Sequence, residues 1–504
     1  MKSGILDYEA SLSVPFVPME EWSIEEKIGM GTFGAVFSMN SSNGQQFAVK
    51  KQYIFRQHAE IIRDTLADLA LLKRTNGKNS YIVPLIGFSI SQQSNPRVSI
   101  IMPLFIGLKQ ALNQRLIVEH HRNKYIYQMI YGLTFLHSRD IYHRDFKPSN
   151  ILYDGEKDCV LLTDFGSSTA LTCSMDTILK EDVVTLWYRP PELLLGGNIY
   201  SGSADIWGLG CTIFELFTNE ALFRADSRVE QTLEIFKVIG TPNDITWPGV
   251  TNYPYYEETF PQYHPNWSYV KRKMPGEWYE FIQYILIGNP SLRPTTFDLI
   301  NSDRFDEYRE EIIPSFSCLD NLYLREMPNK TNYNHTEYLA LIKDISDQLK
   351  FHKKVFFLAA ELLQCYTKKH STSFHPIIVL IISQAYLEQH SVPISHYLLV
   401  LNLESDIEET LIKSCIKFLE EIEFDLAIST AFDFFKQYIR LFYPSDIEEI
   451  AIEILYTIVI TGPGNLLAHE QSLAAIFYAC STLNIPYKHD HLFHRKDIQD
   501  LELI

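Results

Sequence analysis

Residues 143–150, with the sequence HRDFKPSN, place a carboxylate, an ammonium and a carboxamide close together in the chain. The carboxylate of Asp145 could orient and deprotonate a hydroxyl group, which is general-base chemistry. Lys147 could neutralise a phosphoryl group during its transfer, and Asn150 could hold a metal ion. Three such groups at this spacing point to transfer of a phosphoryl group to an alcohol.

A second segment, TDFGSS at residues 163–168, adds a candidate metal ligand. Its Asp164 stands on a tight glycine turn directly after the apolar residues VLL, which read as a strand. A single carboxylate in this place suits Mg²⁺, because Mg²⁺ usually takes one or two protein carboxylates together with phosphate oxygens. We therefore expect Asn150 and Asp164 to share Mg²⁺ that bridges the phosphates of ATP.

Three glycines lie in the segment IGMGTFGAVF, between two predicted strands: Gly29, Gly31 and Gly34. They would let the backbone lie close over phosphates, where a side chain would collide. Lys50 follows in the predicted strand FAVKK, within reach of the same phosphates. Taken alone, the first segment is a hairpin and Lys50 a solvated edge residue. The ordered series of segments favours phosphate binding.

Other polar residues in this region have structural interpretations. We expect His143 to pack in the interior rather than to act in catalysis. Asp205, in DIWGLG, is expected to be a buried carboxylate that binds backbone amides. Glu192, in TLWYRPPELLLG, and Arg293 are expected to form a buried ion pair.

The elements that must position these residues change in type along the chain. Residues 22–56 read as strands with a turn at Asn43-Gly44, and residues 98–102 read as a further strand. Residues 59–74 have the apolar spacing of a helix, and from Leu108 onwards the pattern is mostly helical.

The later part of the chain contains a loop, a linker and a helical region. Prolines and aromatic residues crowd residues 247–268, which we expect to form a long surface loop. Residues 313–334 lose periodicity and are interpreted as a linker. From residue 335 to about residue 483 the pattern is helical throughout, and residues 486–504 are expected to be a tail.

The net charge of −18 argues against a dedicated nucleic-acid-binding protein, which needs a basic face. The longest apolar stretch, residues 377–382, is too short to span a bilayer, so we expect no membrane partner. The seven cysteines include no CxxC pair, which is typical of reduced thiols inside a cell. Because no signal peptide is apparent, we expect a cytoplasmic or nuclear protein.

In this order the segments resemble those of the eukaryotic protein kinase family, over about residues 22–310. Lys147 follows the serine/threonine pattern rather than the tyrosine pattern. VVTLWYRPPELLLG and GTPNDITWPGV are similar to segments of cyclin-dependent kinases, and the former suggests a preference for proline after the phosphorylated residue.

The resemblance implies an α+β bilobal kinase domain at residues 22–312, preceded by an extension at residues 1–21. The small lobe would reach about residue 102, and the large lobe would span residues 107–312, with ATP bound between them. It further implies these ATP-binding residues: Ile28, Gly29, Gly31, Gly34, Val36, Ala48, Lys50 and Asp68.

The sequence departs from the family pattern in the helix predicted at residues 59–74, which corresponds to the regulatory helix of the small lobe. The family pairs the strand lysine with a glutamate, whereas this chain has Asp68, whose side chain is one carbon shorter. For the same ion pair with Lys50, the helix must lie about 1.5 Å closer.

The activation-loop switch of cyclin-dependent kinases is also altered. Lys180 stands where the phosphorylated threonine is usual, and the three arginines that bind its phosphate are reduced to Arg144, with Ala67 and Thr169 at the other two places. Loss of the acceptor together with its receptors indicates loss of the switch. In the glycine segment Thr32 is present, but Phe33 replaces the usual inhibitory tyrosine.

Residues 335–485 resemble a cyclin, with two boxes and a break near residue 440. CIKFLEEIEFDLAISTAFDFFKQYIRLF is similar to a cyclin helix that ends in a Phe-Asp-Leu turn and is followed by a helix capped by Ser429 or Thr430. Cyclins present a lysine and a glutamate to the kinase, and those places hold Gln384 and Cys415 here.

The resulting hypothesis is an ATP- and Mg²⁺-dependent serine/threonine kinase of cyclin-dependent type. It would act on Ser/Thr-Pro protein substrates and carry its own cyclin-like activator as an intramolecular partner. The alternative is a pseudokinase with a cyclin-like adaptor that binds another kinase or regulator. The complete catalytic set favours the enzyme, and Asp68 keeps the alternative open.

Overall fold

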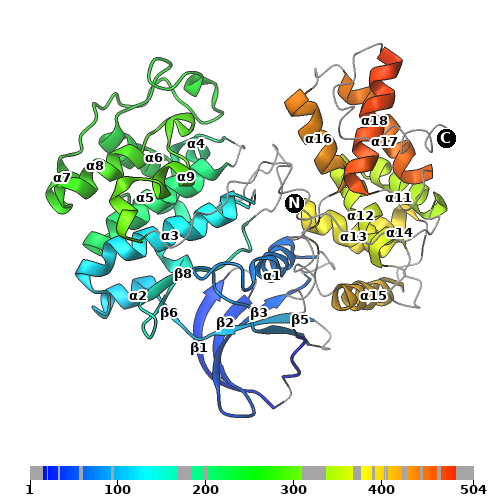
Figure 1. The fold of residues 1–504 in the computed structure, drawn as a ribbon, viewed down its shortest axis with the longest axis horizontal. Helices are drawn as coiled ribbons and strands as arrows, with labels where there is room; N and C mark the ends of the chain where they lie inside the picture. Colours follow the sequence, from blue (N-terminus) through cyan, green and yellow to red (C-terminus); the bar gives the residue numbers. More distant parts are fainter. Residues whose placement is uncertain are drawn as a thin grey trace. The chain divides into compact units, whose positions relative to one another are not determined.

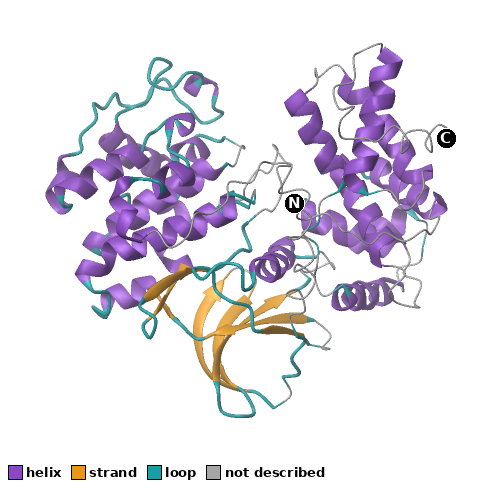
Figure 2. Cartoon of the chain, viewed as in Figure 1, coloured by secondary structure: helices purple, strands orange, loops and turns teal. Residues whose placement is uncertain are grey.

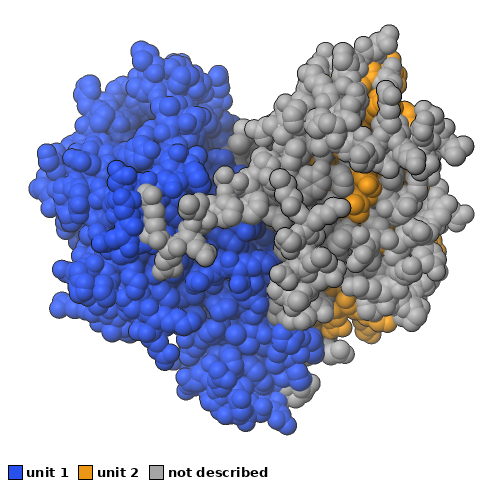
Figure 3. Space-filling model, in the orientation of Figure 1, with its two compact units in different colours: residues 1–52, 71–89, 98–315 blue, residues 53–70, 90–97, 316–504 orange. Residues whose placement is uncertain are grey.

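The computed structural model describes residues 15–19, 21–31, 34–55, 61–91, 96–139, 141–168, 183–197, 201–308, 336–366, 376–388, 392–401, 403, 407–422, 426, 428, 430–442, 447–461 and 467–483. The chain forms two compact units (Figure 3). The first comprises residues 1–52, 71–89 and 98–315, and the second comprises residues 53–70, 90–97 and 316–504. The expected linker, the expected tail and residues 169–182 lie outside the described residues.

A five-stranded sheet forms the first lobe, in the order β1-β2-β3-β5-β4 (Figure 2). Its strands are β1 (Ser23–Gly31), β2 (Gly34–Asn40), β3 (Gln46–Tyr53), β4 (Gly87–Ile90) and β5 (Arg97–Pro103). The strands expected from the sequence are confirmed. Asn43-Gly44 makes the β2–β3 turn, in which Gly44 takes a φ of 81° that side chains disfavour.

The helix of this lobe, α1 (Arg63–Thr75), begins later than residue 59, so that boundary was wrong. Ile61 instead bridges to Phe55, and the Ile62 amide donates to the Ile54 carbonyl at 2.7 Å. These pairings hold both isoleucines in extended backbone beside the end of β3. Ile61 and Ile62 therefore match the apolar spacing expected of a helix, although they precede α1.

Residues 15–19, which the sequence placed in the extension, add a short parallel partner to the free edge of β4. Phe16 bridges to Phe88, the Val17 amide donates to the Phe88 carbonyl at 2.8 Å, and the Phe88 amide donates to the Pro15 carbonyl at 3.2 Å. Val17 and Met19 pack on the core of the sheet. This segment protects an edge that would otherwise expose unpaired backbone groups.

The large lobe is mostly helical. Its helices are α2 (Leu108–Asn113), α3 (Arg122–His137), α4 (Pro191–Leu194), α5 (Gly202–Thr218), α6 (Arg228–Ile239), α7 (Ser268–Lys273), α8 (Gly276–Ile285) and α9 (Thr296–Ile300). A small sheet of β6 (Ile106–Gly107), β7 (Ile151–Asp154) and β8 (Cys159–Leu162) carries the loops of the candidate site. Helix α5 is buried along almost its whole length and forms the centre of this lobe.

The loop expected at residues 247–268 is present but is not confined to the surface. Trp247, Val250 and Phe260 are buried, and a 3₁₀ turn covers Val250–Asn252. Burial of large apolar side chains anchors the loop to the lobe.

Most of the described residues after residue 335 lie in helices. The helices are α11 (Thr336–Gln348), α12 (Lys353–Tyr366), α13 (Pro376–Leu387), α14 (Ile394–Val400), α15 (Glu408–Glu421), α16 (Ala431–Phe442), α17 (Glu448–Thr461) and α18 (Ala468–Leu483). Helix α12 packs on α11, α13 and α16, and α18 packs on α16 and α17 (Figure 1). Within the described residues, no helix has the length and apolar character that crossing a membrane requires.

A buried ion pair between Lys354 and Asp433 joins α12 to α16. Asp433 also accepts hydrogen bonds from the amide and hydroxyl of Thr430, at 2.8 and 2.9 Å, and so completes the start of α16. Thr430 therefore stands at the helix start as expected, whereas Ser429 lies outside the described residues.

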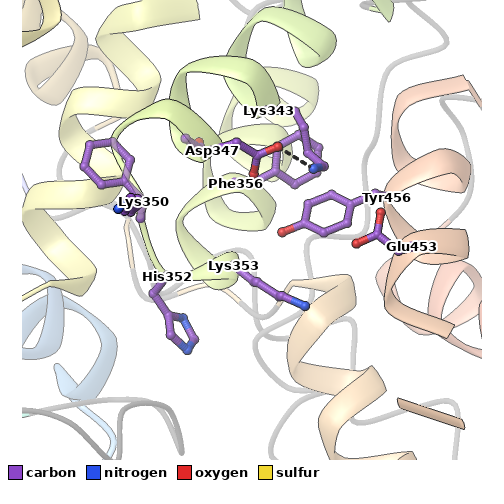
Figure 4. Close-up of a pocket in the computed structure, with 10 residues that line it drawn as sticks. Lys343, Asp347, Lys350, His352, Lys353, Phe356, Glu453 and Tyr456 are labelled. Carbon is purple, nitrogen blue, oxygen red and sulfur yellow. Dashed lines mark hydrogen bonds and ion pairs between the residues drawn. The ribbon is translucent and has the colours of Figure 1, made fainter. Parts of the chain in front are cut away.

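A cavity of about 300 Å³ lies between α11, α12 and α17 (Figure 4). Lys343 bonds to Asp347 at 2.8 Å and lies 4.2 Å from the centre of the Tyr456 ring. Lys353 and Glu453 bring opposite charges to the same cavity. This mixture favours no single class of ligand.

The segment at residues 15–19 yields a first prediction. A Cβ at Gly87 would lie 2.5 Å from a Val17 methyl and 2.9 Å from the Pro15 carbonyl, so Gly87→Ala should displace the segment. Losing its two backbone hydrogen bonds should cost about 1–3 kcal/mol. The amide of Phe88 should then exchange with solvent faster in hydrogen-exchange mass spectrometry.

The matched control is Gly276→Ala, because a Cβ there meets nothing within 4 Å. Unchanged exchange around Phe88 in Gly87→Ala would show that residues 15–19 do not protect β4.

Candidate active site

The structure brings Asp145, Lys147 and Asn150 together at the loop before β7. Lys147 Nζ lies 2.6 Å from Asp145 Oδ2. The side-chain Nδ2 of Asn150 donates to the backbone carbonyl of Asp145 at 2.8 Å and to the Asp145 carboxylate at 3.0 Å. The carboxylate is thus fixed by two neighbours and keeps oxygen lone pairs for a further donor, as a general base requires.

Asp164 follows β8 and meets the lysine of β3. Lys50 Nζ lies 2.9 Å from Asp164 Oδ1. The charge of Lys50 is the main cause that lowers the pKa of Asp164 to about 2, against an opposing effect of burial. Asp164 is therefore ionised at any physiological pH, which a metal ligand must be.

Asp205 of α5 holds the backbone of the loop that carries Asp145. Its carboxylate accepts hydrogen bonds from the His143 and Arg144 amides, each at 2.8 Å, and lies 2.8 Å from His137 Nε2. Burial acts to raise the pKa of Asp205, but these partners stabilise the anion and leave that pKa below its usual value. Arg144 has a φ of 66°, an unfavourable conformation that these bonds maintain.

His143 joins the two polar segments and is fully buried. Its Nε2 lies 3.0 Å from the Thr163 carbonyl, and its own carbonyl accepts from the Ser168 hydroxyl at 3.1 Å. Its ring packs on Phe146 and Phe165. The expected packing role is confirmed, and it aligns Asp145 with Asp164.

The glycine segment forms the β1–β2 hairpin, with Thr32 and Phe33 outside the described residues. A Cβ at Gly34 would lie 2.0 Å from the Lys51 carbonyl, so the neighbouring strand alone requires glycine there. Gly29 faces Val36 at an ordinary distance of 3.5 Å. Phosphate binding by this segment stays a prediction, because part of its glycine pattern has a purely structural cause.

The remaining residues predicted to bind ATP occupy the sheet and α1. Ala48 is buried and Ile28 is 43% exposed, while Val36 is paired with Lys50 across β2 and β3. Asp68 is buried in α1. Its ion pair with Lys50 stays a prediction.

A buried ion pair between Glu192 and Arg293 is confirmed. The guanidinium donates to both carboxylate oxygens at 2.7 Å and lies 4.9 Å from the centre of the Trp207 ring. This bidentate geometry is the strong form of such a pair. It fixes the segment that follows residues 169–182.

One polar cluster was not predicted from the sequence. Glu215 of α5 binds Lys109 at 2.5 Å and the Tyr188 hydroxyl at 2.6 Å. The three residues come from distant segments, so no local spacing indicates their contact. Only the placement of α2 and of residues 183–188 against α5 reveals it.

The donor set fits Mg²⁺ and the phosphates of ATP. Asp164 and Asn150 offer a carboxylate and an amide oxygen, which Mg²⁺ accepts, and Lys50 and Lys147 offer cations for phosphate. The described residues contain no group of three His, Cys, Asp or Glu side chains that could hold a metal ion. Phosphate oxygens and water would therefore complete the coordination of the ion.

A comparison with protein-family models agrees with this geometry. The model described as the protein kinase domain matches residues 22–305, which is more than half of the 504 residues.

The role of Asp205 yields a second prediction. Asp205→Asn turns an acceptor oxygen into a donor that faces backbone amides, and should lower the free energy of unfolding by about 3–5 kcal/mol. Because the folded pKa of Asp205 is depressed, its stabilisation is present above about pH 3.9 and lost as the pH falls through the folded value. Urea unfolding between about pH 3 and 7 measures both effects.

Asp303→Asn, at an exposed aspartate, is the control and should leave the unfolding midpoint unchanged. If Asp205→Asn kept both the stability and the acid dependence of the wild type, Asp205 would not hold the loop.

Proposed function

Because the chain belongs to the protein kinase family, we propose that it is a serine/threonine kinase of cyclin-dependent type with its own cyclin-like activator. The observation that carries the enzymatic part is the geometry around Asp145. Its carboxylate lies 2.6 Å from Lys147 and within hydrogen-bond distance of Asn150, and these are the partners that phosphoryl transfer requires.

Each residue of the site has a defined task in this reaction. Bound ATP supplies the γ-phosphoryl group, and Mg²⁺ neutralises its charge. Asp145 orients the substrate hydroxyl and accepts its proton, while Lys147 stabilises charge on the phosphoryl oxygens. Lys50 contacts the α- and β-phosphates, which requires its ammonium to turn from Asp164 toward ATP.

Substrate class is proposed from sequence motifs. Lys147, two residues after Asp145, matches serine/threonine kinases, and VVTLWYR is similar to the segment that accepts proline after the phosphorylated residue. Protein substrates with Ser-Pro or Thr-Pro follow from this proposal.

The described helices from α11 to α18 are consistent with an all-helical, cyclin-like domain. Gln384 and Cys415 are both buried, and Gln384 accepts a hydrogen bond from the Val392 amide at 3.1 Å. Neither position can present an exposed charge to a kinase surface. The activator must use other residues, and the covalent link raises its effective concentration enough for weaker contacts to suffice.

We further propose that activity does not depend on phosphorylation of the activation loop. Lys180 occupies the acceptor place, and Ala67 and Thr169 occupy the places of two phosphate-binding arginines. Of the three arginines that bind the phosphate in cyclin-dependent kinases, only Arg144 is present here. A phosphate on the loop would therefore form few charge-assisted hydrogen bonds and would order the loop only weakly.

A pseudokinase adaptor is the second candidate. It is favoured by Asp68, whose shorter side chain weakens the ion pair expected with Lys50. It predicts nucleotide or partner binding without phosphoryl transfer.

The enzymatic proposal is tested with purified full-length protein, labelled ATP and a Ser-Pro peptide library. Asp145→Asn should lower kcat by about 10²–10⁴-fold with little effect on ATP binding, because it removes the proton acceptor. Asp164→Asn should weaken binding of Mg²⁺-ATP by about tenfold or more. Asp303→Asn serves again as the exposed control.

Equal rates for wild type and Asp145→Asn would mean that the measured activity is not that of this chain. Absence of transfer with every peptide, together with intact ATP binding, would favour the adaptor.

The activator proposal predicts that residues 1–312 alone are at least about tenfold less active than the full chain, because the proposed activator is then missing. Adding residues 335–485 separately should restore activity only at high concentration. Circular dichroism and thermal unfolding must first show that residues 1–312 are folded. Full activity of the folded kinase part would leave the helical domain a docking role only.

A further inference from the structure

A cavity of about 550 Å³ lies beside the catalytic loop. Pro148 and Ser149, which directly follow Lys147, line one side of it, and Trp187 and Tyr188 line another. A peptide whose hydroxyl reaches Asp145 would run close to these residues, since Pro148 and Ser149 lie three and four residues after Asp145. A side chain close to the phosphorylated residue can therefore enter the cavity, and the charges of the lining determine which side chain fits.

The carboxylate of Glu215 in this cavity is already neutralised. One oxygen lies 2.5 Å from Lys109 Nζ, and the other accepts from the Tyr188 hydroxyl at 2.6 Å. Lys109 also donates to the Asn219 carbonyl at 2.9 Å and to its side-chain oxygen at 3.0 Å. An ammonium has three donors, so Lys109 has none left for a ligand.

The second carboxylate of the lining, Glu220, is neutralised in the same way. It accepts from the Tyr269 hydroxyl at 2.7 Å, and Lys273 lies 3.1 Å from both of its oxygens. Each carboxylate therefore already has a lysine beside it, which weakens its attraction for a basic side chain of a substrate.

Arg224 is different, because its charge is not balanced. Its guanidinium lies 4.8 Å from the centre of the Trp187 ring, and the Trp187 indole is fixed by donating to the Ala225 carbonyl at 3.0 Å. In the described part of the chain no carboxylate lies within 4.0 Å of this guanidinium. The cavity thus has an oriented, exposed cation with five donors and an aromatic wall.

We propose that this cavity binds an acidic side chain of the protein substrate and that Arg224 determines this specificity. The inference rests on the proposed kinase function and adds a substrate class to it. A carboxylate can pair with the guanidinium in a fork geometry, whereas a lysine or arginine would be repelled by Arg224 and would meet two carboxylates that already have a lysine beside them.

The test uses the full-length protein and Ser-Pro peptides in which Glu, Gln or Lys is scanned through four positions on each side of the serine. At one or two adjacent positions, kcat/KM should be about fivefold higher with Glu than with Gln, and lowest with Lys. The preference should weaken as salt is added. Arg224→Gln should remove it, and Arg224→Glu should reverse it in favour of Lys.

Arg272→Gln is the matched control, since Arg272 is an exposed arginine outside the cavity, and it should keep the wild-type preference. The proposal is overturned if the Glu-to-Lys ratio is the same in wild type and Arg224→Glu. If no peptide is phosphorylated at all, the kinase function fails instead. Fluorescence anisotropy of labelled Glu and Lys peptides then tests the cavity by binding alone. The wild type should bind the Glu peptide more tightly and Arg224→Glu the Lys peptide. An equal affinity ratio in both proteins would overturn the proposal.

Discussion

The buried carboxylate of Asp205 is the constraint on which the catalytic loop depends. Two backbone amides and His137 all bind this one group, and they hold Arg144 in a conformation that a free chain avoids. That backbone turn directs the next residue, Asp145, toward Lys147 and Asn150. Because Asp205 lies in the buried helix α5, the loop that carries Asp145 is anchored to the centre of the large lobe.

Two lysine–aspartate pairs determine the charge distribution of the candidate site. Lys147 faces Asp145 and Lys50 faces Asp164, so each carboxylate has a cation beside it that would reduce its repulsion of a bound phosphate. His143 connects the two pairs through the Thr163 carbonyl. Each pair therefore stabilises the apo site and provides a cation that can turn to phosphate when ATP binds.

Much of this site could be predicted from the sequence, because Asp145, Lys147 and Asn150 lie within one short loop. That Asn150 and Asp164 share a metal ion was also expected from their residue types, and it stays a prediction. Less predictable were features set by tertiary contacts: the pairing of residues 15–19 with β4, the later start of α1, and the cluster around Glu215. Apolar spacing gives no information about such pairings, since they join segments far apart in the chain.

We propose that this chain transfers phosphate with its own residues and without a phosphorylated activation loop. The most direct measurement treats active full-length protein with phosphatase, verifies by mass spectrometry that residues 169–182 carry no phosphate, and then repeats the peptide assay. We expect kcat and KM to stay unchanged. A large loss of activity that Thr177→Ala or Ser174→Ala reproduces would contradict it, because the phosphorylation switch would then have moved along the loop rather than disappeared.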